Sequence, residues 1–459
     1  MNKLNEIKDI KQIKQKYSKF YWGLYNYIII PILSILKLIL KYFIPKLKIR
    51  EDNWKRIYDE TIIKFKSNYL TTQKVIWFHS ASMGEFEQAK PVIELLKSNP
   101  KTKDCVIIVT FFSPSGYENQ KNYKYADYIL YIPFDLIKNV NDFISTFMPN
   151  VAIFIRYDIW FNFLTLLNQK QIPTLLISAT FSNSFNKKIS KLLQSEKKQK
   201  SIFDLKLNFY REILSKIDYI FCATDEDFKR FEYLNLRSNI LKSGDTRIDR
   251  ILNVVELNKQ KSIINKKIFN NRKVIIVGSS WIEEEKLLSE IKVSLINYQL
   301  IIVPHEPTIE HIARANELFD KVILFSELEL QLSLGNLINL ENKVIVVDSI
   351  GKLLSLYSIA DVAFVGGGFR TGLHSVLEPA GFGLPIICGP KLEKQVDSYK
   401  LKELGGLFII NNSEELLELI KKLNNQAIIK QIAKINKEYL SINSGFSQII
   451  YDKITEVVN

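Results

Sequence analysis

The feature that most constrains the fold is an alternation of short β-branched runs with longer amphipathic segments, starting at residue 75. The first series of runs reads VIWFHS, CVIIVTF, YILYIP, VAIFIR, TLLIS and YIFCA. The second reads KVIIVGS, LIIVP, KVILF, KVIVVD, VAFVGGG, PIICG and LFII. Such runs are apolar on both faces, as are strands of a parallel sheet that helices cover on both sides. The pattern predicts two successive Rossmann-like α/β domains.

A polar segment rich in turn residues separates the two series, near residues 240 to 265. A chain of 459 residues also exceeds the size at which one core keeps growing. We therefore predict an N-terminal Rossmann-like domain over 51–245, a C-terminal one over 246–440 and a final helix over 441–459. Residues 1–50 form a basic N-terminal region with an apolar segment.

That apolar segment indicates membrane attachment. Residues 20–36, FYWGLYNYIIIPILSIL, carry no charge, and Lys37, Lys41 and Lys46 follow. A spanning helix needs about 20 apolar residues, so a spanning helix and a helix lying in the membrane interface both stay open. A buried core helix is the third alternative. No alanine precedes Ala81, so an A-x-A signal-peptidase site is absent.

The distribution of charge and the spacing of the cysteines and histidines limit the classes of function that the chain can have. Residues 1–74 carry 16 Lys and Arg against 6 Asp and Glu, so the rest holds only +4 of the net charge of +14. The positive charge therefore surrounds the apolar segment and does not indicate a nucleic-acid surface. The three cysteines form no C-x-x-C motif and the four histidines no metal-ligand spacing, so we expect a reducing compartment and no metal held by protein ligands.

The first candidate site is the stretch HSASMGE, which follows a predicted strand. His79 and Ser80 end the strand, and Ser82 and Glu85 fit the S-x-x-E capping box of the next helix. Glu85 would also project from the carboxyl edge of the sheet, where open α/β folds bind ligands. The helix dipole would keep it ionised, as a general base requires, and Gly84 would let a substrate approach the backbone. A helix cap and a catalytic base both stay open for Glu85.

The second candidate site is DVAFVGGGFRTGLHSVLEPAGFGLPIICGP, residues 361–390. The glycines at 366–368 follow a predicted strand, so we expect their exposed amides and the next helix N-terminus to cradle a phosphate. We expect Glu378 to lie one helical turn beyond His374 and to accept hydrogen bonds from ribose hydroxyls. The triple glycine is neither a Walker loop nor G-x-G-x-x-G, so it is weak on its own.

Three further loops supply candidate residues. Ser279 and Ser280 follow a strand and are expected to bind phosphate oxygens, whereas the acidic residues of the following IEEE are expected to be first-turn charges that suit the helix dipole. His305 in VPHEP ends the next strand, with a merely structural role as the alternative. Arg247 in SGDTRID is a candidate phosphate clamp at the domain junction.

Together these motifs resemble a known family. WFHSASMGEFEQAKPVIELL, SGDTRID, VGSSW, VPHEP and GGGFRTGLHSVLEPAGFGLPIICGP, in this order behind an apolar segment, are similar to the 3-deoxy-D-manno-octulosonic acid (Kdo) transferases of lipopolysaccharide assembly. The resemblance implies a GT-B fold: two Rossmann-like domains with parallel sheets facing across a cleft, a membrane-anchor helix before them, and a final helix returning to the first domain. It implies inverting, metal-independent transfer of Kdo from CMP-Kdo to a lipid A precursor, without a bound cofactor, at the cytoplasmic side of the inner membrane.

Residue by residue, the resemblance assigns the general base to Glu85. The candidate acceptor or Kdo-side residues are His79, Ser80, Ser82, Gly84, Arg156 and Asp158. The candidate nucleotide-binding residues are Arg247, Gly278, Ser279, Ser280, His305, Gly366, Gly367, Gly368, Gly372, His374, Ser375 and Glu378. The chain departs from the family at Ser375, often asparagine, and at RYDIW (156–160), where the family has an acidic pair before the aromatic residue.

Two other functions stay open. Another GT-B enzyme could use a UDP-sugar, as a transferase or a 2-epimerase, since fold alone does not set the substrate. The membrane segment and the HSASMGE motif count against an epimerase, which acts on a soluble substrate. A non-catalytic, basic, membrane-bound binding protein is the alternative from another class. The sequence does not set the number of Kdo residues transferred, the acyl-chain preference or the oligomeric state.

Overall fold

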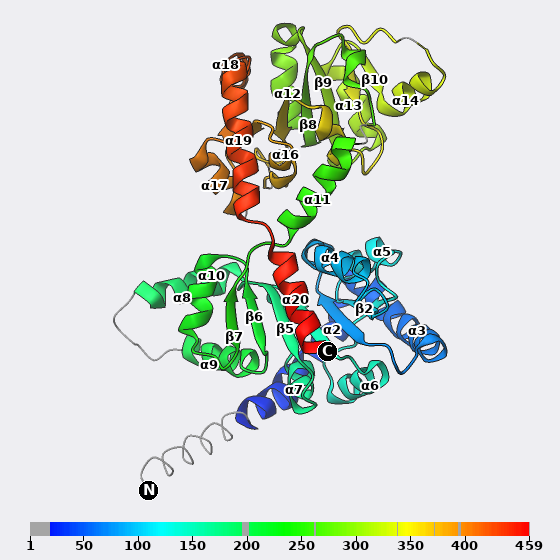
Figure 1. Ribbon diagram of the computed structural model, residues 1–459, viewed down its shortest axis with the longest axis vertical. Coiled ribbons are helices and arrows are strands. Elements are labelled where there is room, and N and C mark those ends of the chain that lie inside the picture. The colour runs from blue at the N-terminus through cyan, green and yellow to red at the C-terminus, as the bar shows by residue number, and fades with distance from the viewer. Residues whose placement is uncertain are drawn as a thin grey trace. The chain divides into compact units, whose positions relative to one another are not determined.

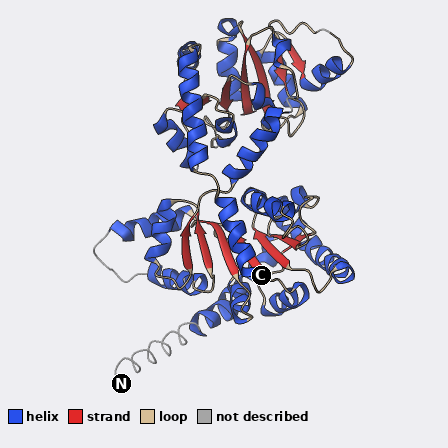
Figure 2. Ribbon diagram, in the orientation of Figure 1, coloured by secondary structure: helices blue, strands red, loops and turns tan. Residues whose placement is uncertain are grey.

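The computed structural model describes residues 19–194, 202–260, 263–336, 338–370, 372–392 and 396–458. The chain divides into two compact units (Figures 1 and 2). The first ends at Asp249 and resumes with Ser444, and the second is Arg250–Asn443. The sequence-based boundaries at 245 and 440 therefore differ by a few residues from this division. Of the predicted basic N-terminal region, residues 1–18 lie outside the described residues.

The first unit is built on a parallel sheet of seven strands in the order β3-β2-β1-β4-β5-β6-β7. Its strands are β1 Val75–Ser80, β2 Val106–Phe111, β3 Tyr128–Tyr131, β4 Val151–Ile155, β5 Thr174–Ala179, β6 Tyr219–Cys222 and β7 Asn239–Lys242. In β1, Ile76 pairs with Val151 of β4, and Val75 pairs with Val106 of β2. Strand order reverses between β1 and β4, as at the switch point of a Rossmann fold.

Helices cover both faces of this sheet, which explains why the strands read as continuous apolar runs. Side chains of α4 and α20 pack with Ile76 and Phe78 on one face, and the other face holds Trp77. The helices are α3 Pro45–Asn68, α4 Met83–Ser98, α5 Pro114–Gln120, α6 Ile137–Phe147, α7 Phe161–Gln169, α8 Asn183–Gln194, α9 Ile202–Leu214, α10 Asp225–Tyr233 and α20 Phe446–Val458. The end of the chain thus packs in the core of the first unit.

The apolar N-terminal segment is a helix that docks on the first unit. Residues Lys19–Leu40 form 22 residues of helix with a mean hydropathy of 1.8. The helix contains a π-helical turn, η1 Tyr25–Ile29, followed by α2 Ile30–Leu40. Among the described residues it is the one helix long and apolar enough to cross a membrane, by length and composition alone. Tyr21, Tyr25 and Ile30 are buried against the unit, whereas most of its other large apolar side chains are exposed.

The second unit has its own parallel sheet of seven strands, in the order β10-β11-β9-β8-β12-β13-β14. Its strands are β8 Lys273–Ser280, β9 Tyr298–Pro304, β10 Val322–Leu324, β11 Val344–Val346, β12 Val362–Val365, β13 Ile386–Cys388 and β14 Leu407–Ile409. The order reverses between β8 and β12, so the second unit also has a switch point. Two Rossmann-like domains with parallel sheets are therefore confirmed.

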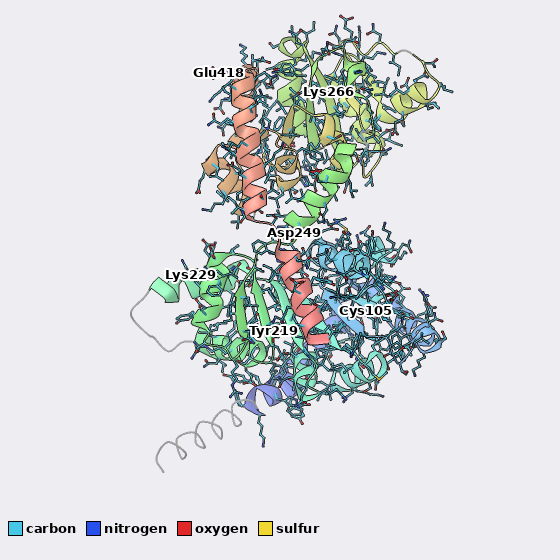
Figure 3. All side chains as sticks on the ribbon, in the orientation of Figure 1. Cys105, Tyr219, Lys229, Asp249, Lys266 and Glu418 are labelled. Carbon is cyan, nitrogen blue, oxygen red and sulfur yellow. The ribbon has the colours of Figure 1, made fainter. Side chains whose placement is uncertain are left out.

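The helices of the second unit again lie on both faces of its sheet. They are α11 Arg247–Gln260, whose first three residues belong to the first unit, η2 Lys266–Phe269, α12 Ile282–Glu290, η3 Lys292–Leu295, α13 Ile309–Leu318, α14 Phe325–Ser333, α15 Leu353–Leu356, η4 Tyr357–Ile359, α16 Leu377–Gly381, α17 Val396–Leu404, α18 Ser413–Lys422 and α19 Gln426–Ile442. Cys105, labelled in Figure 3, is buried and free, as are Cys222 and Cys388.

Candidate active site

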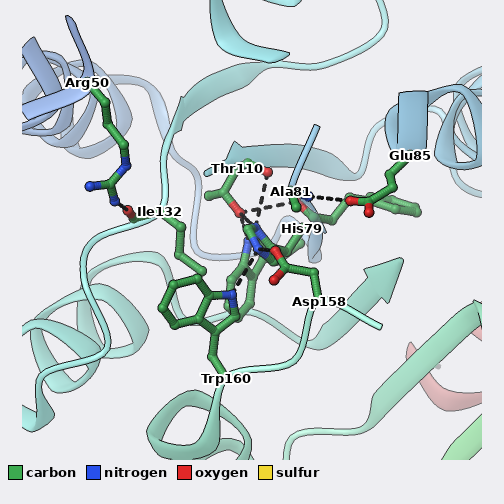
Figure 4. Close-up of polar contacts among 10 residues, drawn as sticks. Arg50, His79, Ala81, Glu85, Thr110, Ile132, Asp158 and Trp160 are labelled. Carbon is green, nitrogen blue, oxygen red and sulfur yellow. Dashed lines mark hydrogen bonds and ion pairs between the residues drawn. The ribbon is translucent and has the colours of Figure 1, made fainter. Parts of the chain in front are cut away.

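Glu85 lies at the switch point of the first unit, in the first turn of α4. Its Oε2 accepts the backbone amide of Ala81 at 2.8 Å (Figure 4). The Glu85 amide lies 3.5 Å from the Ser82 hydroxyl. The side chains thus form the reciprocal cap that the S-x-x-E motif predicts. The cap uses one carboxylate oxygen only: among the described residues, none hydrogen-bonds Oε1. Cap and base are therefore compatible roles for Glu85, which is 7% exposed.

Burial raises the pKa of Glu85, and the negative charge of Asp158 raises it further. The Ala81 amide, Arg156 and His79 oppose this shift without cancelling it. The shift runs against the effect expected of the helix dipole, because burial outweighs the local charges that favour the ionised carboxylate. A raised pKa brings a carboxylate closer to the working range of a general base near neutral pH.

His79 lies in β1, the strand before Glu85, and contacts the loop after β4. It is fully buried, its Nδ1 lies 2.8 Å from the Thr110 hydroxyl, and its Nε2 lies 2.7 Å from Oδ2 of Asp158 (Figure 4). The indole nitrogen of Trp160 lies 3.2 Å from the same Nε2. The tautomer with its hydrogen on Nε2 donates to Asp158 and accepts from Thr110. His79 therefore orients Asp158 and is itself inaccessible to a substrate.

The other acceptor-side candidates differ in accessibility. A Cβ added at Gly84 would meet nothing within 4 Å, so the space beside the α4 N-terminus is open. Arg156 adopts a left-handed backbone with φ of 63°, and its buried Nε has no hydrogen-bond partner. Ser80 is fully buried and its Oγ is also unpartnered. Gly84 and Arg156 are thus better placed to meet a ligand than Ser80.

In the second unit the three glycines serve close packing. A Cβ at Gly366 would lie 2.2 Å from the carbonyl oxygen of Ser279, and one at Gly368 would lie 2.6 Å from the Gly389 amide nitrogen. Gly367 has φ of 88°, and its amide donates to Oε1 of Glu284 at 2.9 Å. The predicted cradle of three free amides is therefore wrong for Gly367, whose amide a carboxylate already occupies.

The helix expected to complete that cradle is also different. α16 begins at Leu377, nine positions after Gly368, and has only five residues. His374 precedes it in irregular backbone, so Glu378 is not one helical turn beyond His374. Glu378 and Gly372 are half-buried, and Ser375 is exposed. These residues follow β12, but a helix dipole aimed at a phosphate is absent from this described loop.

Two glutamates of α12 organise this edge, and sequence reasoning missed both. Glu284 is fully buried and also accepts the Trp281 amide at 3.0 Å, and burial raises its pKa to about 7. Glu285, fully buried too, accepts the Ser280 hydroxyl at 2.6 Å and lies 2.6 Å from Nε2 of His311. Both glutamates do lie in the first turn of α12, as expected, but they are buried and hydrogen-bonded, which the expectation of simple first-turn charges did not include. Ser280 donates to Glu285 and is buried, which removes it from direct phosphate contact.

Three rings gather beside this loop. The Trp281 and His305 rings stack at 4.9 Å, and the His305 and His374 rings lie 4.5 Å apart. Burial lowers the pKa of His374, and His305 lowers it further. The Arg370 guanidinium lies 4.8 Å from the Trp281 ring. The structure thus brings two predicted histidines together and adds Trp281 and Arg370, which the sequence argument did not single out.

The remaining nucleotide-side candidates are Gly278, Ser279 and Arg247. A Cβ at Gly278 would lie 2.1 Å from the Tyr357 hydroxyl, so this glycine is needed for packing. Ser279 is half-buried with φ of 52°. Arg247 belongs to the first unit, where its Nε donates to Asp245 at 2.7 Å. Burial alone would raise the pKa of Asp245, but Arg247 holds it below its usual range.

Comparison with known proteins agrees with this architecture. The family model described as 3-Deoxy-D-manno-octulosonic-acid transferase (kdotransferase) matches residues 56–250. A 3-deoxy-D-manno-octulosonic acid transferase of Rickettsia bellii is 26% identical over 396 residues, 81% of this chain and 88% of the relative. That of Aquifex aeolicus is 26% identical over 388 residues, 83% and 94% of the two chains.

Two further proteins, with other activities, are similar to this chain in sequence or in fold. A bifunctional glycosyltransferase/methyltransferase of Fusobacterium nucleatum is 27% identical over 78% of this chain, which spans only 54% of that protein. The crystal structure of a UDP-GlcNAc 2-epimerase from Neisseria meningitidis aligns with a TM-score of 0.56 at 16% identity, covering 84% of this chain and 100% of the epimerase. The latter likeness concerns the fold alone. The matched family model and the transferase relatives indicate that this chain is a glycosyltransferase similar to the Kdo transferases.

Proposed function

We propose that this protein transfers Kdo from CMP-Kdo to a lipid A precursor, with inversion at the Kdo anomeric carbon and Glu85 as the general base. The observation that carries the proposal is that the two oxygens of the Glu85 carboxylate have different hydrogen-bond environments. Oε2 is fixed by the Ala81 amide at 2.8 Å, and no described residue hydrogen-bonds Oε1. A base needs this combination of a fixed orientation and a free proton-accepting oxygen.

The proposed reaction is a single displacement. A sugar hydroxyl oxygen of the acceptor attacks the Kdo anomeric carbon while the bond from that carbon to the CMP phosphate oxygen breaks. Oε1 of Glu85 takes the hydroxyl proton, and CMP leaves from the opposite face with the bonding electron pair. Base catalysis of this kind contributes roughly 10²- to 10⁴-fold, and alignment of donor and acceptor contributes a further large share.

Arg156 is the proposed electrostatic partner of the acceptor side. Its guanidinium, whose buried Nε has no hydrogen-bond partner, lies near enough to Glu85 to lower the pKa of that carboxyl, and Gly84 leaves open space beside the helix. An arginine in this position favours an acceptor or donor group with negative charge, such as a phosphate or the Kdo carboxylate. The departure of RYDIW from the family's acidic pair would thus change charge selection at this site.

The nucleotide is proposed to bind the second unit at the carboxyl ends of β8 and β12. The side chains there that are partly or fully exposed are Ser279, His305, His374, Ser375 and Glu378. Gly366, Gly367 and Gly368 shape the backbone of this edge, Gly372 adds a positive φ of 130°, and Trp281 and Arg370 extend it. As the resemblance implies, neither a metal ion nor a bound cofactor takes part.

The proposed location is the cytoplasmic side of the inner membrane. The docked helix buries Tyr21, Tyr25 and Ile30 against the first unit, whereas Tyr27 is 74% exposed and Ile32 52% exposed. Lys37 still contacts the unit near the other end of the helix, through an ion pair of 2.8 Å with Glu51. A helix held along its length by a water-exposed domain fits an in-plane interfacial anchor.

The test is a transfer assay with CMP-Kdo and a lipid A precursor, comparing wild type with Glu85→Gln. Glutamine keeps an oxygen for the Ala81 amide but cannot accept the proton, so activity falls by 10²- to 10⁴-fold in a folded protein. Ser82→Ala is the matched control, because it weakens the cap and leaves the base. Near-normal transfer by Glu85→Gln would overturn the assignment of the base. Transfer from a UDP-sugar but none from CMP-Kdo would overturn the assignment of CMP-Kdo as the donor.

A further inference from the structure

Asp135 is a fully buried carboxylate at which the N-terminal helix meets the rest of the first unit. It follows β3, and its Oδ2 accepts the hydroxyl of Tyr25 at 2.8 Å. The same oxygen accepts the Asn162 amide at 3.0 Å, and Oδ1 accepts the Phe163 amide at 3.1 Å. One side chain thus joins the apolar helix to the start of α7, elements that are far apart in the sequence.

Asp135 is the N-terminal cap of α7. The residue in the N-cap position is Trp160, which makes no side-chain cap hydrogen bond. Asn162 and Phe163 are the second and third residues of the helix, and their amides are the ones that a capping side chain normally accepts. A carboxylate from another loop therefore fixes the first turn of α7, at the end where the helix dipole favours negative charge.

That first turn continues directly from the candidate active-site loop. Trp160, immediately before α7, has its indole nitrogen 3.2 Å from Nε2 of His79. Asp158, two residues earlier, lies 2.7 Å from the same nitrogen and influences the pKa of Glu85 (Figure 4). A shift in the first turn of α7 would therefore move the groups that surround the base.

The apolar N-terminal helix makes specific contacts with α7 in addition to nonspecific hydrophobic packing. Tyr25 is buried and its ring lies 5.1 Å from that of Phe161, the first residue of α7. Asn26 exchanges two amide hydrogen bonds with Asn162, at 2.7 and 3.0 Å. Tyr25 and Asn26 stand in the π-helical turn η1, a rare geometry often found at functional positions. Tyr27, in the same turn, is 74% exposed.

We propose that the docked N-terminal helix is part of the active-site scaffold, and that Tyr25, acting through Asp135, is a positioning residue for Asp158 and Trp160. The helix would then do two things: hold the protein at the membrane and order the acceptor side of the site. The catalytic part of this inference rests on the proposed role of Glu85 in Kdo transfer. The structural part, coupling of the helix to the 156–163 segment, does not.

The experiment uses the full chain in detergent micelles, with Tyr25→Phe compared with Tyr27→Phe as the matched control. Each change removes one hydroxyl from the same helical turn. Hydrogen exchange of the 156–165 backbone amides should become about tenfold faster in Tyr25→Phe and stay unchanged in Tyr27→Phe, as expected for loss of one buried hydrogen bond. Exchange in the second unit should not change. Unchanged exchange of 156–165 in Tyr25→Phe would overturn the inference, whatever the substrate.

Kinetics on the same variants test the catalytic part. In Tyr25→Phe we expect kcat for Kdo transfer to fall about tenfold while KM for CMP-Kdo stays constant, since the nucleotide candidates lie in the other unit. A rise in KM for CMP-Kdo with constant kcat, or equal kcat in both variants, would overturn the positioning role. If wild type transfers no Kdo, the proposed function fails, and the exchange result alone decides the coupling.

Asn26→Ala provides a second, milder variant should Tyr25→Phe fold poorly. It removes the amide pair with Asn162 but leaves the Asp135 cap in place. A smaller acceleration of exchange in the same segment, with the second unit unaffected, is expected. Acceleration spread over both units would show general destabilisation and overturn the inference.

Discussion

The first strand-to-helix turn in each unit presents a glutamate at the third position of the helix, and the two glutamates have opposite surroundings. Glu85 in α4 accepts one amide, from Ala81, and its other oxygen has no described partner. Glu284 in α12 accepts two amides, from Trp281 and Gly367, and is fully buried. The same local pattern therefore leaves one carboxylate oxygen without a described partner in the first unit and gives a structural clamp in the second.

What separates the two is the tertiary environment of the turn. Beside Glu85 the space above Gly84 is open. Beside Glu284 the backbone of Gly367 returns from a strand that lies far along the chain and fills the equivalent position. A helix cap is thus compatible with catalysis only where the third residue's carboxylate retains an unused oxygen that a substrate can reach.

The largest expected effect comes from making the same change at both glutamates. Glu85→Gln should lower Kdo transfer by 10²- to 10⁴-fold and change the free energy of unfolding little, because the amide bond to Ala81 can persist. Glu284→Gln should cost about 1–3 kcal/mol of stability, because its NH₂ group cannot accept the second amide. Transfer assays with hydrogen exchange on both variants measure the two effects. A stable, active Glu284→Gln protein would contradict the clamp.

The next effect is a pH dependence of the stability of the second unit. Burial raises the pKa of Glu284 to about 7 from its ordinary 4.5, so the folded state favours the protonated form. This contribution to stability is complete below about pH 4.5 and is lost as the pH rises through 7. We expect the stability of the second unit to fall by about 3 kcal/mol over this interval.

Hydrogen exchange of the β8 and β12 amides, corrected for the intrinsic pH dependence of exchange, measures that fall. In Glu284→Gln the side chain no longer titrates, so the pH dependence should largely vanish even though the protein is less stable at low pH. A slope that is equal in the two proteins would show that other groups are responsible.

A smaller effect comes from adding one methyl group to a glycine in each unit. In Gly368→Ala the new Cβ would lie 2.6 Å from the Gly389 nitrogen, so the backbone must move, at a cost of about 1–3 kcal/mol. In Gly84→Ala it meets nothing within 4 Å, and alanine is the better helix former, so the fold should be retained. Thermal unfolding measures the loss of stability in each variant. Equal losses would contradict the difference between the close packing at Gly368 and the open space at Gly84.

The sequence predicted the fold well because its strongest signal, strands apolar on both faces, depends only on local order. It also predicted the cap of α4, since Ser82 and Glu85 are three residues apart. It could not predict that Gly367 would find Glu284, because these residues are 83 positions apart and a first-turn glutamate usually faces solvent. The role of Asp135 could not be predicted for the same reason. Its partner Tyr25 lies 110 positions away, in a segment whose sequence indicates only a membrane anchor.

The smallest effect concerns the charges around Glu85. The base acts when deprotonated, so transfer falls as the pH drops through the pKa of Glu85. Asp158 raises that pKa, so Asp158→Asn should move the acid limb of the kcat profile to lower pH; Arg156 lowers it, so Arg156→Gln should move the limb to higher pH.

Opposite shifts, measured as the pH of half-maximal kcat in the two variants, would identify Glu85 as the titrating base independently of how far each variant lowers the rate. Shifts in the same direction would mean that another group titrates. Because Asp158 is also held by His79 at 2.7 Å, its removal would release that histidine, yet a buried His79 cannot reach the acceptor and so cannot set the acid limb itself. The direction of the two shifts therefore tests the role of Glu85 as the base more directly than the size of any single loss of activity.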